Sequence, residues 1–376
     1  MAGRILGTYS CFGYRAGNVN LGPPYRAARS LVNRSTWLIT HAIWSAFLIV
    51  FSVFFGLELV FRVLDEAKLP YLYYMAEDII LVSISGMPRR LYLDLPLIVL
   101  ISVAVGLGGL AQTSELTILR AAGLSIRQIF FKICLVLSPV LVLSLGIAEY
   151  GMPESERYSQ ALKDDKVSDG VVDSIWTRES GNYIQLEGRP DGSVRRWKQV
   201  EMRESKDEIV RLISSDAIFF GDQVVQLFNA RTLDFGSNAI IERVETISQD
   251  TSLSAHQVRW LIQNPEALSL TELWDASAYL TSEGLNARAH SQLFWQRLLL
   301  PFTLIALALL ASATAFGSMR SLGMSTRVFL AVSMGLVFKY AMDMASPAVF
   351  LAGGHPSLAI VLPLLIPLLL TPRLLR

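Results

Sequence analysis

The chain has 376 residues, of which 52% are hydrophobic and 17% are charged, and its mean hydropathy is +0.43. A soluble domain carries about a quarter charged residues, so this composition excludes an ordinary soluble protein. The net charge is +1 and the basic residues form no stripe, which excludes a nucleic-acid-binding surface. Charged residues gather between positions 154 and 290 and nearly vanish from long stretches elsewhere.

Residues 1–35 are polar and rich in Gly, Arg and Asn. They lack an apolar core followed by a small-residue cleavage site, which distinguishes them from a secretory signal. We interpret them as a cytoplasmic tail. The two cysteines, Cys11 and Cys134, lie in this tail and in an apolar segment, and their spacing predicts neither a structural disulfide nor a zinc or redox site.

The apolar stretches predict about six transmembrane helices, because a span needs roughly 20 mostly apolar residues to cross about 30 Å of hydrocarbon. Several stretches contain prolines, which membrane helices tolerate when neighbouring groups satisfy the freed carbonyls. The predicted spans are residues 37–61, 93–111, 129–148, 294–316, 328–344 and 358–370. The first three belong to a predicted unit at residues 36–150.

Basic residues in the connecting segments predict that both termini are cytoplasmic. The pair Arg89 and Arg90 falls on the opposite side and weakens the pattern. The residues that set the orientation are Arg15, Arg26, Arg29, Arg34, Arg120, Arg127, Lys132, Arg320, Arg327, Arg373 and Arg376. In this orientation residues 150–290 lie outside the cytoplasm.

Residues 151–268 predict a folded extracytoplasmic all-β domain. Several short runs alternate apolar and polar residues, as at positions 183–187, and Gly-rich turns separate them. The runs are residues 174–178, 182–187, 194–202, 209–220, 224–235 and 240–248. Six or more short antiparallel strands predict a small sandwich, jelly roll or barrel.

From Leu270 the pattern becomes helical. One face of the predicted helix carries Leu270, Leu273, Trp274 and Ser277, and acidic residues lie away from it. We therefore assign residues 269–376 to an amphipathic helix followed by the fourth to sixth spans.

Catalytic signatures are absent from the sequence. There is no phosphate-binding loop of the G-x-x-x-x-G-K-[ST] type, no HExxH motif and no G-x-S-x-G elbow. The four histidines, His41, His256, His290 and His355, are scattered. We therefore assign no catalytic or metal-binding residue.

Residues 113–123 predict a short helix between the second and third spans. Thr113 or Ser114 can cap it, Glu115 then lies in the first turn, where it favours the helix dipole, and Gly123 can end it. An apolar stripe for docking consists of Leu116, Leu119 and Ala122. On physical grounds alone, this segment fits equally well a capped interfacial helix and a coupling helix held by a cytoplasmic ATPase.

Two pairs of opposite charge are spaced four residues apart in predicted spans, which brings them onto one helix face. Glu58 and Arg62 lie near the outward end of the first span, and Lys339 and Asp343 lie in the fifth. Ionisable residues in spans are costly and often functional. We expect an ion pair within each helix, and for the second pair we favour a structural role over a substrate contact.

Two segments resemble the LptF/LptG family of lipopolysaccharide-export permeases. Residues 111–123 resemble the family's Ser-Glu-Leu…Ala-Ser-Gly coupling helix. Phe294, Trp295, Arg297 and Pro301, followed by residues 316–324, resemble the LptG branch, in which Gly-Pro-Leu-Arg-Ser-Val-x-Met-Gly is usual. Ser318 stands where a proline is common. The layout of three spans, an outward β-domain and three spans also matches.

The resemblance implies an α-helical polytopic protein of the inner membrane with an inserted periplasmic jelly-roll-like domain. It implies an exporter that extracts lipopolysaccharide from the membrane. An LptF-like permease and a dimeric LptB-like ATPase complete this exporter, and LptC/LptA-like jelly-roll proteins receive the lipid. ATP and Mg are then bound by the ATPase, and this chain itself has no cofactor and is not an enzyme.

The resemblance also implies roles for individual residues. Glu115 matches the acid of the coupling helix, and the ATPase contact is completed by Ser114, Leu116, Arg120 and Gly123. Basic positions that contact lipid phosphates match Arg62, Lys68 and Lys163. Gln160 replaces a further arginine of this set.

Three alternatives remain open at the level of sequence. The chain could be the LptF-like subunit, which shares the topology, a polytopic membrane enzyme acting on lipids, or an envelope scaffold. An enzyme needs a cluster of polar residues inside the spans, whereas only isolated pairs occur. A scaffold needs no capped, Arg-flanked cytoplasmic helix.

Overall fold

The computed structural model describes residues 23–68, 76–166, 173–179, 182–188, 194–203, 208–221, 224–235, 240–251, 254–316 and 323–374. Most of the predicted tail, at residues 1–22, and positions 317–322 of the LptG-like motif lie outside the described residues. Residues 39–376 form one unit, and all contacts given below lie within it.

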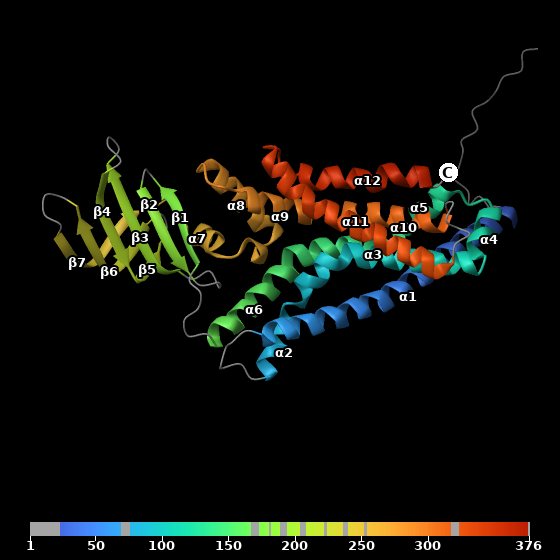
Figure 1. Ribbon diagram of the computed structural model, residues 1–376, viewed down its shortest axis with the longest axis horizontal. Helices are drawn as coiled ribbons and strands as arrows, with labels where there is room; N and C mark the ends of the chain where they lie inside the picture. The colour runs from blue at the N-terminus through green and yellow to red at the C-terminus, as the bar shows by residue number, and fades with distance from the viewer. Residues whose placement is uncertain are drawn as a thin grey trace, which may run out of the picture. The chain divides into compact units, whose positions relative to one another are not determined.

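The helices come in two groups, one on each side of a β-domain in the sequence (Figure 1). The first group comprises α1 (Pro23–Ala67), α2 (Ala76–Ser85), α3 (Met87–Gln112), α4 (Glu115–Ala121), α5 (Ile126–Gly146), the π-helix η1 (Ile147–Gly151) and α6 (Met152–Lys166). The second comprises α7 (Ala255–Ile262), the 3-10 helix η2 (Pro265–Ala267), α8 (Leu270–Ser282), α9 (Arg288–Leu298), α10 (Leu300–Phe316), α11 (Met324–Leu351) and α12 (Leu358–Leu374).

Four of the described helical stretches are long and apolar enough to cross a membrane: Ser35–Ala67, Met87–Gln112, Ile126–Lys163 and Ser325–Val349. They correspond to the first, second, third and fifth predicted spans. The fourth predicted span is instead a pair of helices, α9 and α10, bent by 51°. The sixth corresponds to a shorter apolar helix, Leu358–Leu369. The predicted multi-pass architecture is thus confirmed: among the described residues, four helices have full length, the bent pair can make a fifth span, and the sixth predicted span is a shorter apolar helix.

Pro301 explains the bend between α9 and α10. It is the second residue of α10, lacks an N–H group and crowds the carbonyl four residues earlier, which belongs to Arg297. That carbonyl accepts a hydrogen bond of 3.4 Å from the Tyr92 hydroxyl of α3. A neighbouring helix therefore satisfies the carbonyl that the proline frees, as expected for proline in a membrane helix.

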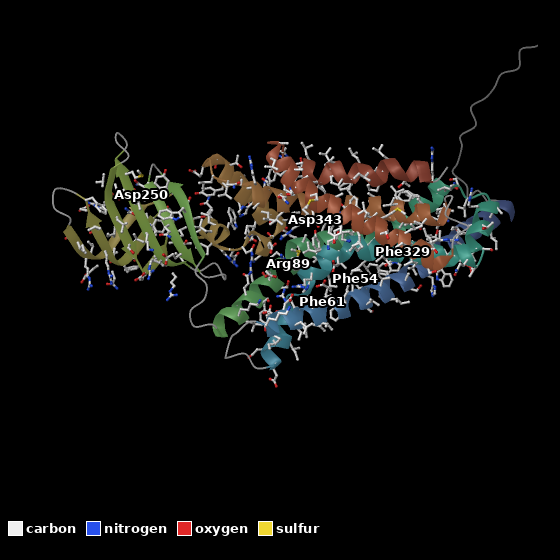
Figure 2. All side chains as sticks on the ribbon, viewed as in Figure 1. Phe54, Phe61, Arg89, Asp250, Phe329 and Asp343 are labelled. Carbon is white, nitrogen blue, oxygen red and sulfur yellow. The ribbon has the colours of Figure 1, made fainter. Side chains whose placement is uncertain are left out.

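The helix α3 forms the core of the membrane part. Five of its apolar residues are fully buried: Ile98, Val99, Leu100, Val103 and Leu107. It packs along α10 and α11, and Gly106 lets α1 approach closely, because a Cβ atom there would lie 2.8 Å from the Ala42 carbonyl oxygen. By contrast, α1 and α11 expose apolar side chains, including Phe61 and Phe329, which project from the helices in Figure 2. Such faces fit lipid or a membrane partner.

The β-domain is one antiparallel sheet of seven described strands, which confirms the predicted all-β domain. Along the sheet their order is β1-β2-β3-β4-β6-β5, and β7 also pairs with β6. The strands are β1 (Asp173–Glu179), β2 (Asn182–Gly188), β3 (Val194–Arg203), β4 (Glu208–Ser215), β5 (Ala217–Phe220), β6 (Val224–Asp234) and β7 (Ile240–Asp250). The predicted run at residues 209–220 forms two strands, because a bend at Asp216 interrupts the extended backbone. There the Ser215 hydroxyl donates to the Phe228 carbonyl at 2.7 Å.

One face of the sheet is apolar and is covered by α7. Leu186 and Trp197 pair across β2 and β3 and are fully buried, and Trp197 contacts the Phe220 ring. Gly188 lies so close to Ile262 of α7 that an added Cβ would meet its Cγ2 at 2.2 Å. Beside this core, a hydrogen bond from Lys198 holds the pKa of Glu187 below its usual range, with Arg196 adding to the effect.

The helix α8 confirms the predicted amphipathic segment, with one correction. Ser269 caps it in a capping box with Glu272. Leu273 and Ser277 are buried as predicted, but Trp274 is 53% exposed, and its ring contacts the Phe294 ring of α9. The buried face is completed by Ala276 and Leu280, so it is rotated relative to the prediction.

Candidate functional site

The predicted coupling segment is a helix of seven residues, α4, which connects α3 to α5. Its end matches the prediction: Gly123 has φ +93°, its N–H donates to the Arg120 carbonyl, and the N–H of Leu124 donates to the Leu119 carbonyl. This pattern is a Schellman motif. Its start does not match. Ser114 is in the left-handed conformation with φ 63° and makes no side-chain cap. The Thr113 hydroxyl instead donates back to the carbonyls of α3.

The two faces of α4 differ in exposure. Leu116 is 4% exposed and borders the same small cavity as Ala315 and Phe316 of α10, so it anchors α4 to its own chain. Leu116 therefore does not belong to a free docking stripe with Leu119 and Ala122. The exposed apolar residue of the helix is Ile118, at 65%.

Glu115 lies in the first turn of α4 and is half-buried. Within the described part of the chain, no hydrogen bond or ion pair engages its carboxylate. Arg120 lies in the last turn and is exposed. Both charges favour the helix dipole, and both remain accessible to a partner.

Two of the three predicted substrate residues meet at one carboxylate. Lys163 of α6 lies 2.6 Å from Glu66 of α1, and Arg62 Nε lies 3.6 Å from the same carboxylate. Arg62 is 7% exposed and also donates to Ser159 of α6 at 3.3 Å. Gly86 provides the space, because a Cβ there would meet the Arg62 guanidinium at 2.3 Å.

This basic cluster, formed by Arg62, Lys163 and Glu66, carries an excess of positive charge. A single carboxylate neutralises one of two cations, and the buried Nε of Arg62 has no hydrogen bond. A buried guanidinium with unused donors favours an additional anion, and its planar fork suits a phosphate. Sequence reasoning missed Glu66, Ser159 and Gly86, although the spacing of Arg62 and Glu66 by four residues was available as a signal.

Lys68 lies apart from the basic cluster in its contacts. Its side chain is 75% exposed and pairs with Asp65 at 3.5 Å. The predicted pair between Glu58 and Arg62 is wrong: Glu58 binds Arg90 of α3 at 3.1 Å. The tertiary partner displaces the one on the same helix, because Arg62 turns toward α6.

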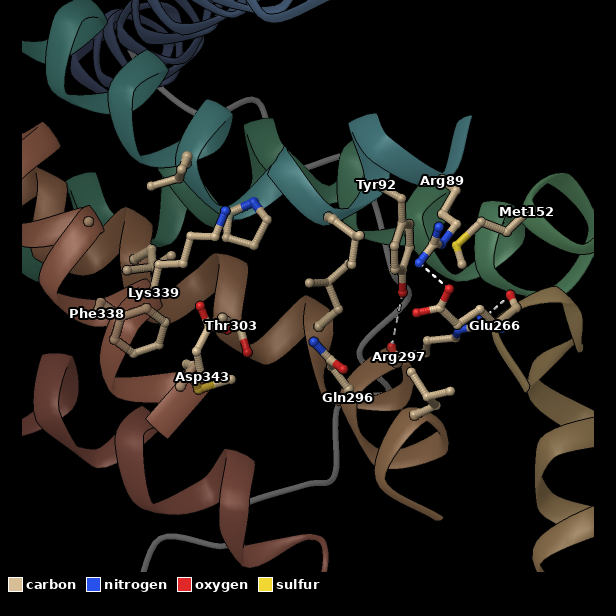
Figure 3. Close-up of a pocket in the computed structure, with 18 residues that line it drawn as sticks. Arg89, Tyr92, Met152, Glu266, Gln296, Arg297, Thr303, Phe338, Lys339 and Asp343 are labelled. Atoms are coloured by element: carbon tan, nitrogen blue, oxygen red, sulfur yellow. Dashed lines mark hydrogen bonds and ion pairs between the residues drawn. The ribbon is translucent and has the colours of Figure 1, made fainter. Parts of the chain in front are cut away.

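A cavity of about 310 Å³ lies between α3, α9, α10 and α11 (Figure 3). Arg89, paired with Glu266, and the buried Arg297 line one part of it. Lys339 and Asp343 line another part, and both are exposed. No ion pair joins these last two residues among the described contacts, so the predicted pair within α11 is wrong. Three of its residues stood out in the sequence: Arg297, which belongs to the LptG-like motif, and the intramembrane residues Lys339 and Asp343.

Comparison with known proteins agrees with the geometry. Residues 37–376 match the family described as lipopolysaccharide export system permease LptF/LptG. The chain is 24% identical over 291 residues to the lipopolysaccharide export system permease protein LptG of Escherichia coli K12, which covers 75% of this chain and 80% of the relative. It is 22% identical over 262 residues to LptG of Haemophilus influenzae, covering 67% and 72%. Both relatives belong to the G branch, as the motifs at residues 294–301 and, above all, 317–323 indicated. The chain belongs to the LptF/LptG family of lipopolysaccharide export system permeases.

Proposed function

We propose that this chain is the LptG-like half of an exporter that moves lipopolysaccharide out of the inner membrane. An LptF-like permease pairs with it in the membrane, and a dimeric LptB-like ATPase binds both on the cytoplasmic side. ATP and Mg bind the ATPase, and this chain supplies no cofactor. Its β-domain lies in the periplasm, both termini lie in the cytoplasm, and LptC/LptA-like jelly-roll proteins accept the lipid.

The observation that carries the proposal is the construction of α4. It is anchored through Leu116, closed at Gly123, and presents an unengaged carboxylate beside exposed Ile118 and Arg120. A short helix that is fixed to the membrane core and free on its outer face is suited to transmit a partner's movement. Because a conformational drive requires different interactions in two states, the ATPase must grip this face differently with and without nucleotide.

The basic cluster supports the lipid as cargo. It offers excess positive charge near the end of α1, where a lipid headgroup phosphate would approach. The exposed apolar faces of α1 and α11 fit acyl chains. A membrane enzyme acting on lipids has no comparable support, since both named relatives are permease proteins.

Glu115→Lys tests the proposal. The substitution turns a charge-assisted contact into a like-charge repulsion wherever the ATPase presents a basic groove. We expect the amount of ATPase that co-purifies with the complex to fall at least tenfold, about 1.4 kcal/mol, while the permease pair still assembles. Asp275→Lys on α8 makes the same charge change elsewhere and should retain the ATPase. Equal recovery of the ATPase by both variants would remove Glu115 from the interface.

A further inference from the structure

A block formed by α7, η2 and α8, residues 254–282, connects the sheet to the membrane helices. We propose that this connector block joins the sheet rigidly to the membrane helices. In this proposal Arg157 is a positioning residue, through which movement of the membrane helices is transmitted to the β-domain. The inference rests on the proposed export function. It concerns residues to which neither the motifs nor the family match assigns a role.

On the sheet side, the connector block is part of the hydrophobic core. Val258, Leu261 and Ile262 of α7, with Leu280 of α8, belong to the same buried cluster as Trp197 and Leu227 of the sheet. The close approach of Gly188 to Ile262 fixes α7 against β2. Interiors packed in this way transmit displacement instead of absorbing it.

On the membrane side, the same block packs on α9. Leu273 and Ala276 of α8 form a second buried cluster, against which Leu293 and Phe294 of α9 pack. The buried guanidinium of Arg297 donates to the Glu266 carbonyl at 2.7 Å and to the Leu268 carbonyl. One α9 side chain therefore binds two backbone carbonyls of the block.

Three polar contacts then attach the block to the first group of helices. Arg157 of α6 donates from one nitrogen, Nη2, to both carboxylate oxygens of Glu272 at 2.6 and 2.8 Å, and the two side chains are only 19% and 15% exposed. Glu149 of η1 accepts from the N–H and the hydroxyl of Thr271 at 3.2 and 2.6 Å. Arg89 of α3 pairs with Glu266. A charge-assisted contact between arginine and carboxylate is shorter and stronger than a hydrogen bond between neutral groups.

Two of the attachments, those at Glu149 and Arg297, lie beside an irregular point of a membrane helix. Glu149 belongs to the π-helix, a feature that often marks functional positions. Arg297 is two residues before Leu299, where α9 and α10 bend by 51°. The cavity in Figure 3 lies next to these points and is lined by Arg89, Glu266 and Arg297. The membrane helices therefore have points at which they can bend and a cavity into which they can move. The connector block is attached close to these points.

The connector block predicts that ATP hydrolysis and lipid delivery can be separated by mutation. Residues that contact the ATPase govern hydrolysis, whereas Arg157 contacts only the connector block and Glu154 of its own helix among the described ion pairs. Loosening Arg157 should leave hydrolysis intact and lower the amount of lipid delivered for each ATP consumed.

The test uses the complete complex in vesicles that contain lipopolysaccharide, with a soluble jelly-roll acceptor protein. Three variants are compared with the parent: Arg157→Leu, Arg157→Lys, and Arg211→Leu, which removes an arginine that pairs with Asp234 inside the sheet. We expect Arg157→Leu to hydrolyse ATP within twofold of the parent and to deliver at least fivefold less lipid per ATP. Arg157→Lys, which keeps the positive charge but replaces the guanidinium by a smaller ammonium group, should be intermediate, and Arg211→Leu should match the parent.

Three results would overturn the inference. Delivery per ATP could be unchanged in Arg157→Leu. Delivery could fall equally in Arg211→Leu. Hydrolysis and delivery could fall together with the amount of assembled complex in both Arg157 variants, which would make Arg157 a purely structural contact. If instead the parent complex itself moves no lipid with ATP, the proposed export function fails, independently of Arg157.

Discussion

The carboxylate of Glu66 lies between two cations from different helices, Arg62 and Lys163. In the proposed function these cations bind a lipid phosphate, and the Glu66 carboxylate competes with that phosphate for them. Glu66→Gln should therefore strengthen the retention of lipopolysaccharide by the purified complex severalfold, since each tenfold change in binding corresponds to about 1.4 kcal/mol. The measurement is the amount of lipopolysaccharide that co-purifies after washing with detergent.

Asp65→Asn provides the matched control for Glu66→Gln. Asp65 is the adjacent acid on α1, is 54% exposed, and pairs with Lys68 and Arg90. Surface pairs of this kind contribute little, so its removal should leave lipid retention unchanged. A lower melting temperature for Glu66→Gln with no gain in bound lipid would show that the cluster only ties α1 to α6.

At the residue scale, spacing in the sequence did not predict which charged residues would pair. Arg62 and Lys163 were matched by resemblance, and the structure brings them to one carboxylate. The expected partner of Arg62, Glu58, instead binds Arg90, which is 32 residues away in the chain. Spacing along one helix identifies which residues can meet on that helix, but it carries no information about arginines that arrive from another helix.

At the scale of single elements, α4 has an anchoring residue and an exposed residue that separate two roles. Leu116→Ala should remove roughly 2 kcal/mol of packing against α10 and increase hydrogen exchange across residues 115–121. Ile118→Asp should leave exchange unchanged, because Ile118 is 65% exposed, yet should weaken ATPase binding. Hydrogen exchange of the permease pair and ATPase co-purification measure the two effects. Unchanged exchange in Leu116→Ala would contradict the anchor, and full ATPase binding by Ile118→Asp would contradict the docking face.

The strands were predictable because alternation and Gly-rich turns are local signals. All the predicted runs correspond to described strands, and the unpredicted break at Asp216 depends on a hydrogen bond from Ser215 to Phe228, which is a tertiary contact. The bend at Leu299 had a visible cause in Pro301, but its direction depends on neighbouring helices. The predicted N-terminal cap of α4 was wrong, because Ser114 adopts a left-handed backbone conformation that no local sequence pattern indicated.

At the scale of the whole chain, composition and hydropathy were sufficient for the class of the protein, and the family match covers residues 37–376. The connector block was not predictable from the sequence, because its contacts join residues that are far apart in the chain. Arg157 and Glu272 are more than a hundred residues apart, and Arg297 lies about thirty residues from the two backbone carbonyls that it binds. A continuous path of contacts also runs from α4 through α3, α9 and α8 to the sheet, and the Tyr92 hydroxyl of α3 donates to the Arg297 carbonyl of α9 on this path.

The central claim is that this chain moves lipopolysaccharide with energy supplied by a separate ATPase. The direct measurement reconstitutes the chain with its LptF-like partner and the ATPase in lipopolysaccharide vesicles, and detects lipid crosslinked to a jelly-roll acceptor that carries a photoreactive residue. We predict that adducts accumulate with time only when ATP is present and only when this chain is in the complex. Adducts that form equally without ATP, or with the partner permease and ATPase alone, would contradict the account.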